Sequence, residues 1–205
     1  MYRPPAFAVD DPAMLRDFIR ANPFAVVMLA QADRVAIAYA PVVLDRDGQR
    51  LRFHLAAGNP VARAADGARL RLSFLGAHAY VSPDWYRSQG MVPTWNYSAV
   101  EAEGIARKTD VAELRALLDE LSAAEEALLL PKAPWIADKV GEARMAALLN
   151  AIAGFEVTLE SFAGKFKLSQ NLKPEDFAGA LDGLEARGDA AGAAVAAQMR
   201  KTRKT

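Results

Sequence analysis

Cysteine is absent from the 205-residue sequence, and histidine occurs only at positions 54 and 78. Without cysteine the chain has no disulfide, no thiolate zinc site, no cysteine-ligated iron–sulfur cluster and no cysteine nucleophile. A catalytic triad would have to use His54 or His78, and neither lies near a nucleophile-elbow motif. The HExxH, P-loop and GxGxxG patterns are also missing. We therefore expect no metal site and assign no catalytic residue.

The sequence has no excess of one charge, since 25 Lys and Arg residues are balanced by 25 Asp and Glu residues. A chain that coats nucleic acid or anionic membrane over its whole surface would need a strong positive excess. No run approaches the ~18–20 apolar residues that span a bilayer. Residues 1–5 lack the apolar run of a signal peptide. With 52% hydrophobic residues the composition is that of a globular protein, and we expect a cytoplasmic one without membrane contact.

Strand patterns dominate the first half of the chain. The uninterrupted apolar run Phe24–Ala30 predicts a buried strand, and the alternating stretch Arg69–Leu75 predicts a half-buried one. Arg34–Leu44 and Leu51–Ala56 are expected to pair as a β-hairpin, because the turn-forming residues 45–50 separate them.

Helix patterns dominate after residue 110. Asp110 and Glu113 form a capping box that begins a helix, and a second capping box at Ser122 predicts that another helix begins there. Further elements are expected as a helix over 141–153, a strand over 155–162, and helices over 174–187 and 189–201. This order favours an α+β fold, with a mostly antiparallel sheet curled into a barrel and helices around it.

The segment from Ala77 to Tyr97 carries an unusual number of Trp and Tyr residues among polar groups. Taken singly, such rings are explained by burial in a core. Together with nearby hydroxyls, amides and cations, they suit a flat heteroaromatic ligand with a charged end. Alternation places Trp95 on the face opposite Thr94 and Asn96. If those two face the ligand, Trp95 faces the core, and its truncation to Ala should cost ~3–5 kcal/mol.

Several strings of residues resemble the PaiB family, whose members are described as FMN-binding negative transcriptional regulators. The strings are NPFA at 22–25, FHLA at 53–56 with Asn59-Pro60 after it, HAYVSPxWY at 78–86, VPTWNY at 92–97, PW at 134–135 and KxKLSQN at 165–171. The resemblance implies a split β-barrel of the flavin reductase and pyridoxamine-phosphate oxidase type, which dimerises and places FMN at the subunit interface. It also implies a barrel domain over residues 1–171, with a helical insertion around 110–153, and a helical extension over 172–205.

Carried over residue by residue, the resemblance implies a set of cofactor-binding side chains. The set comprises His54, Asn59, Tyr80, Ser82, Tyr86, Thr94, Asn96, Lys165, Lys167 and Gln170. In barrels of this type, one strand and the turn after it hold the phosphate. His54 and Asn59 lie at that place, and Lys165 and Lys167 would add positive charge.

Three functions are compatible with the resemblance. The first is an FMN-binding negative transcriptional regulator. Its DNA contact would come from the basic tail Arg200–Thr205, because no helix-turn-helix is visible. The second is a flavin-dependent oxidoreductase that uses a nicotinamide, and the third is a haem-binding barrel with His54 or His78 as axial ligand. Tyr39 and Asp84 depart from the family pattern: Tyr39 replaces a histidine, and Asp84 adds negative charge.

Overall fold

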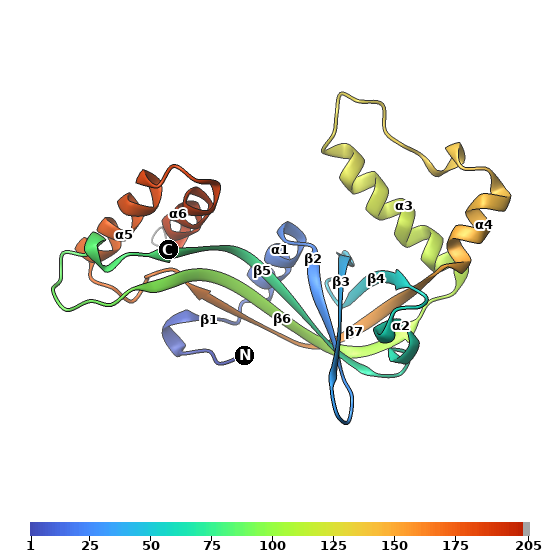
Figure 1. Cartoon of the computed structure of the whole chain (residues 1–205), viewed down its shortest axis with the longest axis horizontal. Coiled ribbons are helices and arrows are strands. Elements are labelled where there is room, and N and C mark those ends of the chain that lie inside the picture. The colour runs from blue at the N-terminus through green and yellow to red at the C-terminus, as the bar shows by residue number, and fades with distance from the viewer. Residues whose placement is uncertain (203–205) are drawn as a thin grey trace. The chain divides into compact units, whose positions relative to one another are not determined.

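A computed structural model describes residues 1–202 of the chain (Figure 1). The chain forms two compact units that alternate along the sequence. The barrel unit comprises Ile19–Phe74 and Ala102–Phe162. The terminal unit comprises Met1–Phe18, Leu75–Glu101 and the residues from Ala163 onward.

The barrel unit is built on six strands. They are β2 (Phe24–Ala30), β3 (Val35–Leu44), β4 (Arg50–Ala56) and parts of β5 (Arg69–Val81), β6 (Thr94–Lys108) and β7 (Ile152–Lys167). The sheet order β7-β4-β3-β2-β5-β6 is closed into a ring by a further pairing of β7 with β6. The pairings of β2 with β3 and β5, and of β4 with β3 and β7, are antiparallel. The predicted α+β fold with a mostly antiparallel barrel is confirmed.

Every second side chain along the strands points into the barrel and fills it. Leu51, Phe53 and Leu55 of β4 are buried, as the sequence pattern predicts. The Phe53 ring stacks on the ring of Phe155 from β7, with 5.6 Å between their centroids. The barrel closes where β6 passes close to β7, since a Cβ atom on Gly104 would lie 1.9 Å from the carbonyl oxygen of Thr158. Glycine is therefore the one residue type that this approach accepts.

Four helical segments complete the barrel unit: α2 (Pro60–Ala64), α3 (Val111–Ala127), η3 (Ala137–Lys139) and α4 (Glu142–Asn150). The capping box of Asp110 and Glu113 begins α3 as predicted. The predicted second helix start at Ser122 is wrong, because α3 continues through it. Inside a helix the backbone N–H groups are already bonded four residues back, so a capping-box pattern there has no free donor to satisfy.

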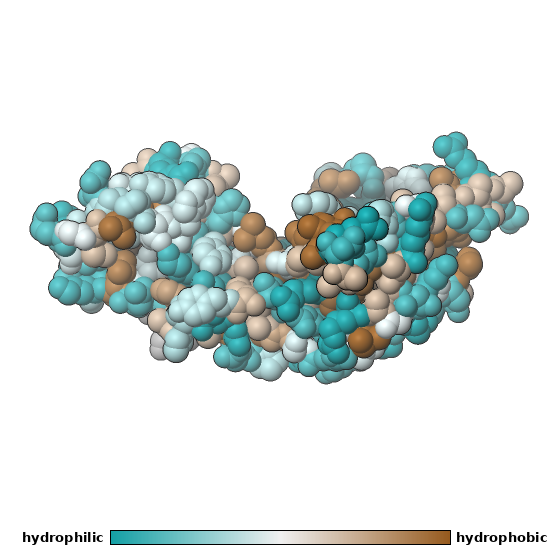
Figure 2. Space-filling model, turned by 60° about the horizontal axis from the view of Figure 1, so that its bottom comes forward, coloured by the Kyte–Doolittle hydropathy of each residue, from teal (hydrophilic) through white to brown (hydrophobic). Residues whose placement is uncertain are grey.

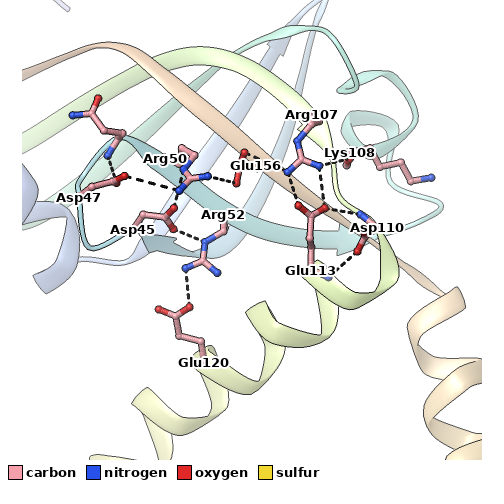
Figure 3. A network of polar contacts seen from close by, with 11 residues as sticks. Asp45, Asp47, Arg50, Arg52, Arg107, Lys108, Asp110, Glu113, Glu120 and Glu156 are labelled. Atoms are coloured by element: carbon pink, nitrogen blue, oxygen red, sulfur yellow. Dashed lines mark hydrogen bonds and ion pairs between the residues drawn. The ribbon is translucent and has the colours of Figure 1, made fainter.

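Ion pairs attach α3 to the strands beneath it (Figure 3). Arg52 of β4 lies between Asp45, at 2.5 Å, and Glu120 of α3, at 2.7 Å. Arg107 at the end of β6 donates to both carboxylate oxygens of Glu113, at 2.7 and 2.9 Å. These contacts hold both the first and the third turns of α3 over the barrel.

The terminal unit contains the outer parts of β5, β6 and β7 with short N-terminal and C-terminal elements. The elements are η1 (Pro5–Phe7), β1 (Ala8–Val9), most of α1 (Pro12–Ala21), η2 (Pro83–Trp85), α5 (Pro174–Ala186) and α6 (Ala190–Thr202). Both C-terminal helices occur where the sequence predicts them, and Figure 1 shows α5 and α6 side by side. The hydrophobic core beneath these two helices includes Val81, Leu168, Phe177, Leu184 and Met199. The proposed domain boundary at residue 171 stays a prediction, and Arg203 and Lys204 of the basic tail lie outside the described residues.

The long strands extend further than the sequence patterns predict. β6 is one strand of 15 residues, whereas the sequence patterns predict one strand over Val92–Tyr97 and another over Val100–Ala106. Ser98 is fully buried, and its hydroxyl donates to the side chain of Gln198 in α6 at 2.8 Å. Because this bond satisfies the buried hydroxyl, the strand continues through Ser98. Within residues 1–202, no helix has both the length and the apolar character needed to cross a membrane.

Candidate functional site

The candidate side chains fall into both compact units. His54 and Asn59 belong to the barrel unit. The terminal unit holds the other eight, namely Tyr80, Ser82, Tyr86, Thr94, Asn96, Lys165, Lys167 and Gln170. Each unit therefore holds its own group of candidate side chains.

Two lysines meet aromatic and polar groups in the terminal unit. We call Thr94, Trp95, Tyr97, Lys165 and Lys167 the lysine cluster. The Lys167 ammonium donates to the Thr94 hydroxyl and, at 3.1 Å, to the backbone carbonyl of Trp95. The Lys165 ammonium lies 5.4 Å from the centroid of the Tyr97 ring. Burial, together with the neighbouring charge of Lys165, lowers the pKa of Lys167. An anion placed beside these lysines would offset that repulsion.

The rings around the lysine cluster are open to solvent. Trp95 is 53% exposed, and its ring centroid lies 5.9 Å from that of His78 and 6.4 Å from that of Tyr80. The expectation that Trp95 faces the core is wrong: Asn96 is buried instead, and Trp95 is on the outer face. Alternation separates the two faces of a strand, but only packing decides which one is covered. In this unit α6 covers the Asn96 side, because Met199 contacts Asn96.

Asn96 belongs to a buried polar network. Its amide nitrogen donates to the Ser169 hydroxyl at 2.9 Å and contacts the Met199 sulfur at 3.5 Å. Ser169 has φ of 61°, a left-handed conformation that is uncommon for serine. The Gln170 side chain accepts from the backbone N–H of Leu168 at 2.7 Å, which braces the same turn. The structure thus uses Asn96 and Gln170 to dock the chain that follows β7.

Ser82 and Tyr86 lie at the two ends of η2. The Ser82 hydroxyl accepts from the backbone N–H of Asp84 and caps this short helix. Tyr86 is buried and is bonded to the Ser169 hydroxyl. Asp84 is exposed, so its departure from the family pattern adds a surface charge.

His54 lines a groove in the barrel unit, which we call the His54 groove. It has a volume of about 570 Å³. It is lined by Pro23, Phe24, Pro41, His54, Leu118, Leu121, Ser122, Glu125, Glu126 and Trp135. His54 is paired across the sheet with Gly154, and a Cβ on Gly154 would lie 3.1 Å from Leu114 of α3. The missing side chain therefore lets α3 pack down beside His54.

The His54 imidazole is electrically neutral in this setting. Its Nδ1 atom is shielded from solvent and has no hydrogen-bond partner. Burial lowers the pKa of His54, because the charged form loses its hydration. The side chain of Asn59 has a structural contact. Its oxygen accepts a hydrogen bond from the backbone N–H of Val61 at 2.9 Å and caps α2.

Sequence reasoning did not assign Phe24, Trp135 or the α3 residues to a site. The strings containing Phe24 and Trp135 were part of the family resemblance, and that was the only signal for them. Tyr39, the other departure from the family pattern, is 65% exposed on β3. Among residues 1–202, no group of three or more His, Cys, Asp or Glu side chains could hold a metal ion.

Comparison with known proteins identifies the family. The model of the family described as "Putative FMN-binding domain" matches residues 1–161. The chain belongs to this family. It is 30% identical over 194 residues to protease synthase and sporulation protein PAI 2 of Bacillus subtilis, an alignment covering 90% of this chain and 89% of that protein. It is 29% identical to the uncharacterized protein AN0679 of Emericella nidulans, with 92% of each chain covered. The predicted PaiB-family membership is confirmed.

Solved structures share the fold of this FMN-binding-domain family member. The FAD and haem binding protein of Mycobacterium smegmatis aligns with a TM-score of 0.57 at 18% identity, covering 78% of this chain and 73% of that one. The flavocytochrome Anf3 of Azotobacter vinelandii aligns with a TM-score of 0.54 at 19% identity, covering 78% and 69%. The split-barrel fold predicted for the chain is confirmed.

The two groups of candidate residues fit FMN unequally. FMN has a flat ring and a phosphate whose charge is close to −2. Its site therefore needs hydrogen-bond donors or cations beside an aromatic or apolar surface. The lysine cluster of this family member supplies two ammonium groups, a hydroxyl and exposed rings. The His54 groove supplies aromatic walls with a neutral imidazole and two carboxylates. The phosphate therefore fits the lysine cluster and is disfavoured in the His54 groove.

Proposed function

We propose that the protein binds FMN and acts as a negative transcriptional regulator whose lysine cluster holds the flavin phosphate. One observation carries the flavin part of this proposal. Lys167 reaches the Thr94 hydroxyl and the Trp95 carbonyl beside Lys165, so two cations and a hydroxyl meet next to exposed rings. The family to which the chain belongs is described by FMN binding, which agrees with this chemistry.

The phosphate assignment is tested by titrating FMN and riboflavin against flavin fluorescence. Lys167→Ala should weaken FMN by ~5–30-fold, the equivalent of one charge-assisted bond of ~1–2 kcal/mol. Riboflavin lacks the phosphate and should keep its affinity. Lys108→Ala, which removes a lysine from the end of β6 in the barrel unit, is the matched control. Equal losses for both ligands would show that Lys167 acts on the ring or the fold, and unchanged FMN binding would refute the assignment.

The same experiment on His54 separates the two candidate phosphate shells. On the proposal, His54→Ala leaves the ratio of FMN to riboflavin affinity unchanged, because a neutral imidazole adds no charge attraction for a dianion. A selective loss of FMN in His54→Ala, with Lys167→Ala unaffected, would move the phosphate to the barrel unit.

We also infer that the protein is a homodimer. The outer face of the β2–β3 hairpin exposes Val35, Ile37 and Tyr39, each more than half exposed. Contiguous apolar surface of this kind marks interaction sites, and a two-fold contact lets one patch cover its copy. Light scattering should give twice the chain mass, and Ile37→Glu should give the monomer mass. A monomeric wild-type protein at micromolar concentration would refute the inference.

The regulatory part is tested separately from the flavin. DNA binding should be measured by mobility shift with promoter fragments, with and without FMN. Oxidation of NADH or NADPH by the FMN-loaded protein, in the absence of any DNA effect, would favour the flavin-dependent oxidoreductase instead.

A haem-binding function has one supporting observation. His78 is exposed beside Trp95, so its imidazole is accessible on the surface of the terminal unit. On this alternative, added haemin would give a Soret band that His78→Ala removes. A spectrum unchanged by His78→Ala would exclude His78 as the axial ligand.

A further inference from the structure

The His54 groove is a built site whose chemistry differs from that of the lysine cluster. Its floor comes from the barrel, through Pro23, Phe24, Pro41 and His54. Its opposite wall comes from α3 and the chain after it, including Leu118 and Trp135. A volume of about 570 Å³ lies within the range of small-molecule pockets.

The α3 wall is fixed in place at both ends. Near the start of α3, Arg107 forms an ion pair with Glu113, and in the third turn Arg52 forms one with Glu120 at 2.7 Å (Figure 3). In the last turn of α3, the Glu126 carboxylate accepts a hydrogen bond from the backbone N–H of Trp135, at 2.8 Å. The Trp135 ring is therefore held at the groove by the helix that forms the wall, and the groove keeps its walls without a ligand.

The polar lining of the groove is acidic. Of the described residues that line it, none is Lys or Arg, and His54 is neutral because burial lowers its pKa. Glu126 is offset by its ion pair with Lys132. Glu125 lines the groove, is exposed to solvent and, among the described residues, forms no ion pair with a Lys or Arg side chain. One carboxylate charge thus remains, next to apolar and aromatic walls.

Aromatic rings add a second attraction for positive charge. Trp135 and Phe24 contribute ring faces or edges to the same groove, and Trp135 is 38% exposed. A cation within reach of an indole face gains attraction from the ring quadrupole, most strongly with Trp. The leucine and proline walls favour an apolar body attached to that cation.

We propose that the His54 groove binds an organic ammonium ion, a protonated amine carried on an apolar or aromatic body. The ammonium lies at Glu125 and the Trp135 ring, and the apolar body lies along Leu118, Leu121 and Pro41. This site is separate from the proposed flavin site and does not depend on it. A regulator or oxidoreductase with such a groove would respond to, or act on, an amine.

The test uses three probes of matched shape and different charge on the full-length protein. Calorimetric titration at physiological salt compares 2-phenylethylammonium, neutral 2-phenylethanol and anionic phenylacetate. The ammonium should bind ~10-fold tighter than the alcohol, since a carboxylate and an indole both favour the cation. Phenylacetate should bind more weakly than either. Equal affinities for ammonium and alcohol, tighter binding of phenylacetate, or no binding of any probe would overturn the proposal.

Variants then place the ammonium in the groove. Glu125→Gln keeps the shape of an exposed side chain and should weaken the ammonium ~3–5-fold, while leaving the alcohol unchanged. Glu142→Gln on α4, outside the groove, is the matched control and should change neither. Trp135→Leu should weaken the ammonium more than the alcohol. An ammonium affinity that Glu125→Gln and Trp135→Leu both leave intact would show that the amine binds elsewhere. FMN titrated in the same cell should not displace the ammonium, and competition between them would also overturn the proposal.

Discussion

Asn96 and Trp95 are neighbours on β6 whose side chains point to opposite faces, and their truncation should have unequal effects. Asn96→Ala removes donations to the Ser169 hydroxyl at 2.9 Å and the Met199 sulfur at 3.5 Å, and the acceptor of a Ser169 contact at 3.2 Å. Because Asn96 is completely buried, water cannot replace these partners without entering the core. We expect a loss of ~2–4 kcal/mol in the free energy of unfolding.

Trp95→Ala should cost much less, although tryptophan is the larger side chain. Trp95 is 53% exposed, so truncation uncovers little apolar surface and opens no cavity. What is lost is its ring contacts with His78 and Tyr80, together about 1 kcal/mol. The sequence alone predicted Trp95 in the core, where its truncation would cost ~3–5 kcal/mol.

Urea unfolding followed by far-ultraviolet circular dichroism measures both variants against the wild type. Wild type and variants should have the same slope with urea, so that the midpoints report stability. The reasoning is refuted if Trp95→Ala is destabilised as much as Asn96→Ala or more. A Trp95→Ala protein that unfolds like wild type but binds FMN more weakly would place the flavin ring on the exposed face of the lysine cluster.

Three further predictions concern the barrel unit. Gly104→Ala should destabilise the protein by ~1–3 kcal/mol in a thermal melt, because a Cβ would meet the Thr158 carbonyl oxygen at 1.9 Å; an unchanged melting temperature would contradict the close approach of β6 to β7. Asp110→Ala should cost ~1 kcal/mol in urea unfolding, and Asp110→Asn, which also caps, should cost clearly less; equal losses would mean that the cap does not stabilise α3. Hydrogen bonding to Arg107 lowers the pKa of Glu113 from 4.5 to about 2, so their pairing stabilises the fold fully above pH 4.5 and is lost as pH falls toward 2. The stability difference between wild type and Arg107→Ala should therefore shrink over that range, and a difference that stays constant would refute the charge pairing.

Local signals in the sequence were sufficient to predict where most helices and strands lie. The buried strand at Phe24–Ala30 and the hairpin after it follow from apolar runs separated by a turn. The start of α3 follows from a capping box, and Asn59 with Pro60 marks the start of α2. These features depend on residues close in sequence, so they can be predicted without knowing what lies across the sheet.

Local signals failed where bonds that other residues form in the folded chain decide the outcome. Ser122 has the side chain of a helix cap, but the helix passes through it because its backbone N–H groups are already satisfied. Ser98 interrupts an apolar pattern, but β6 continues because α6 brings Gln198 to its hydroxyl. At Ser98 the deciding partner is distant in sequence, whereas at Ser122 the bonds of the helix that already contains it decide the outcome.

The candidate site shows the same division. The sequence by itself determined the family, the barrel and the presence of aromatic, lysine and histidine side chains for a flat charged ligand. Only the tertiary structure decided that α6 covers Asn96 and leaves Trp95 exposed. It also decided that α3 lies beside His54, which leaves that imidazole half-buried, with a lowered pKa and an Nδ1 atom that has no hydrogen-bond partner. The physical reason is that charge and exposure depend on every group within a few ångströms, and most of those groups are distant in sequence.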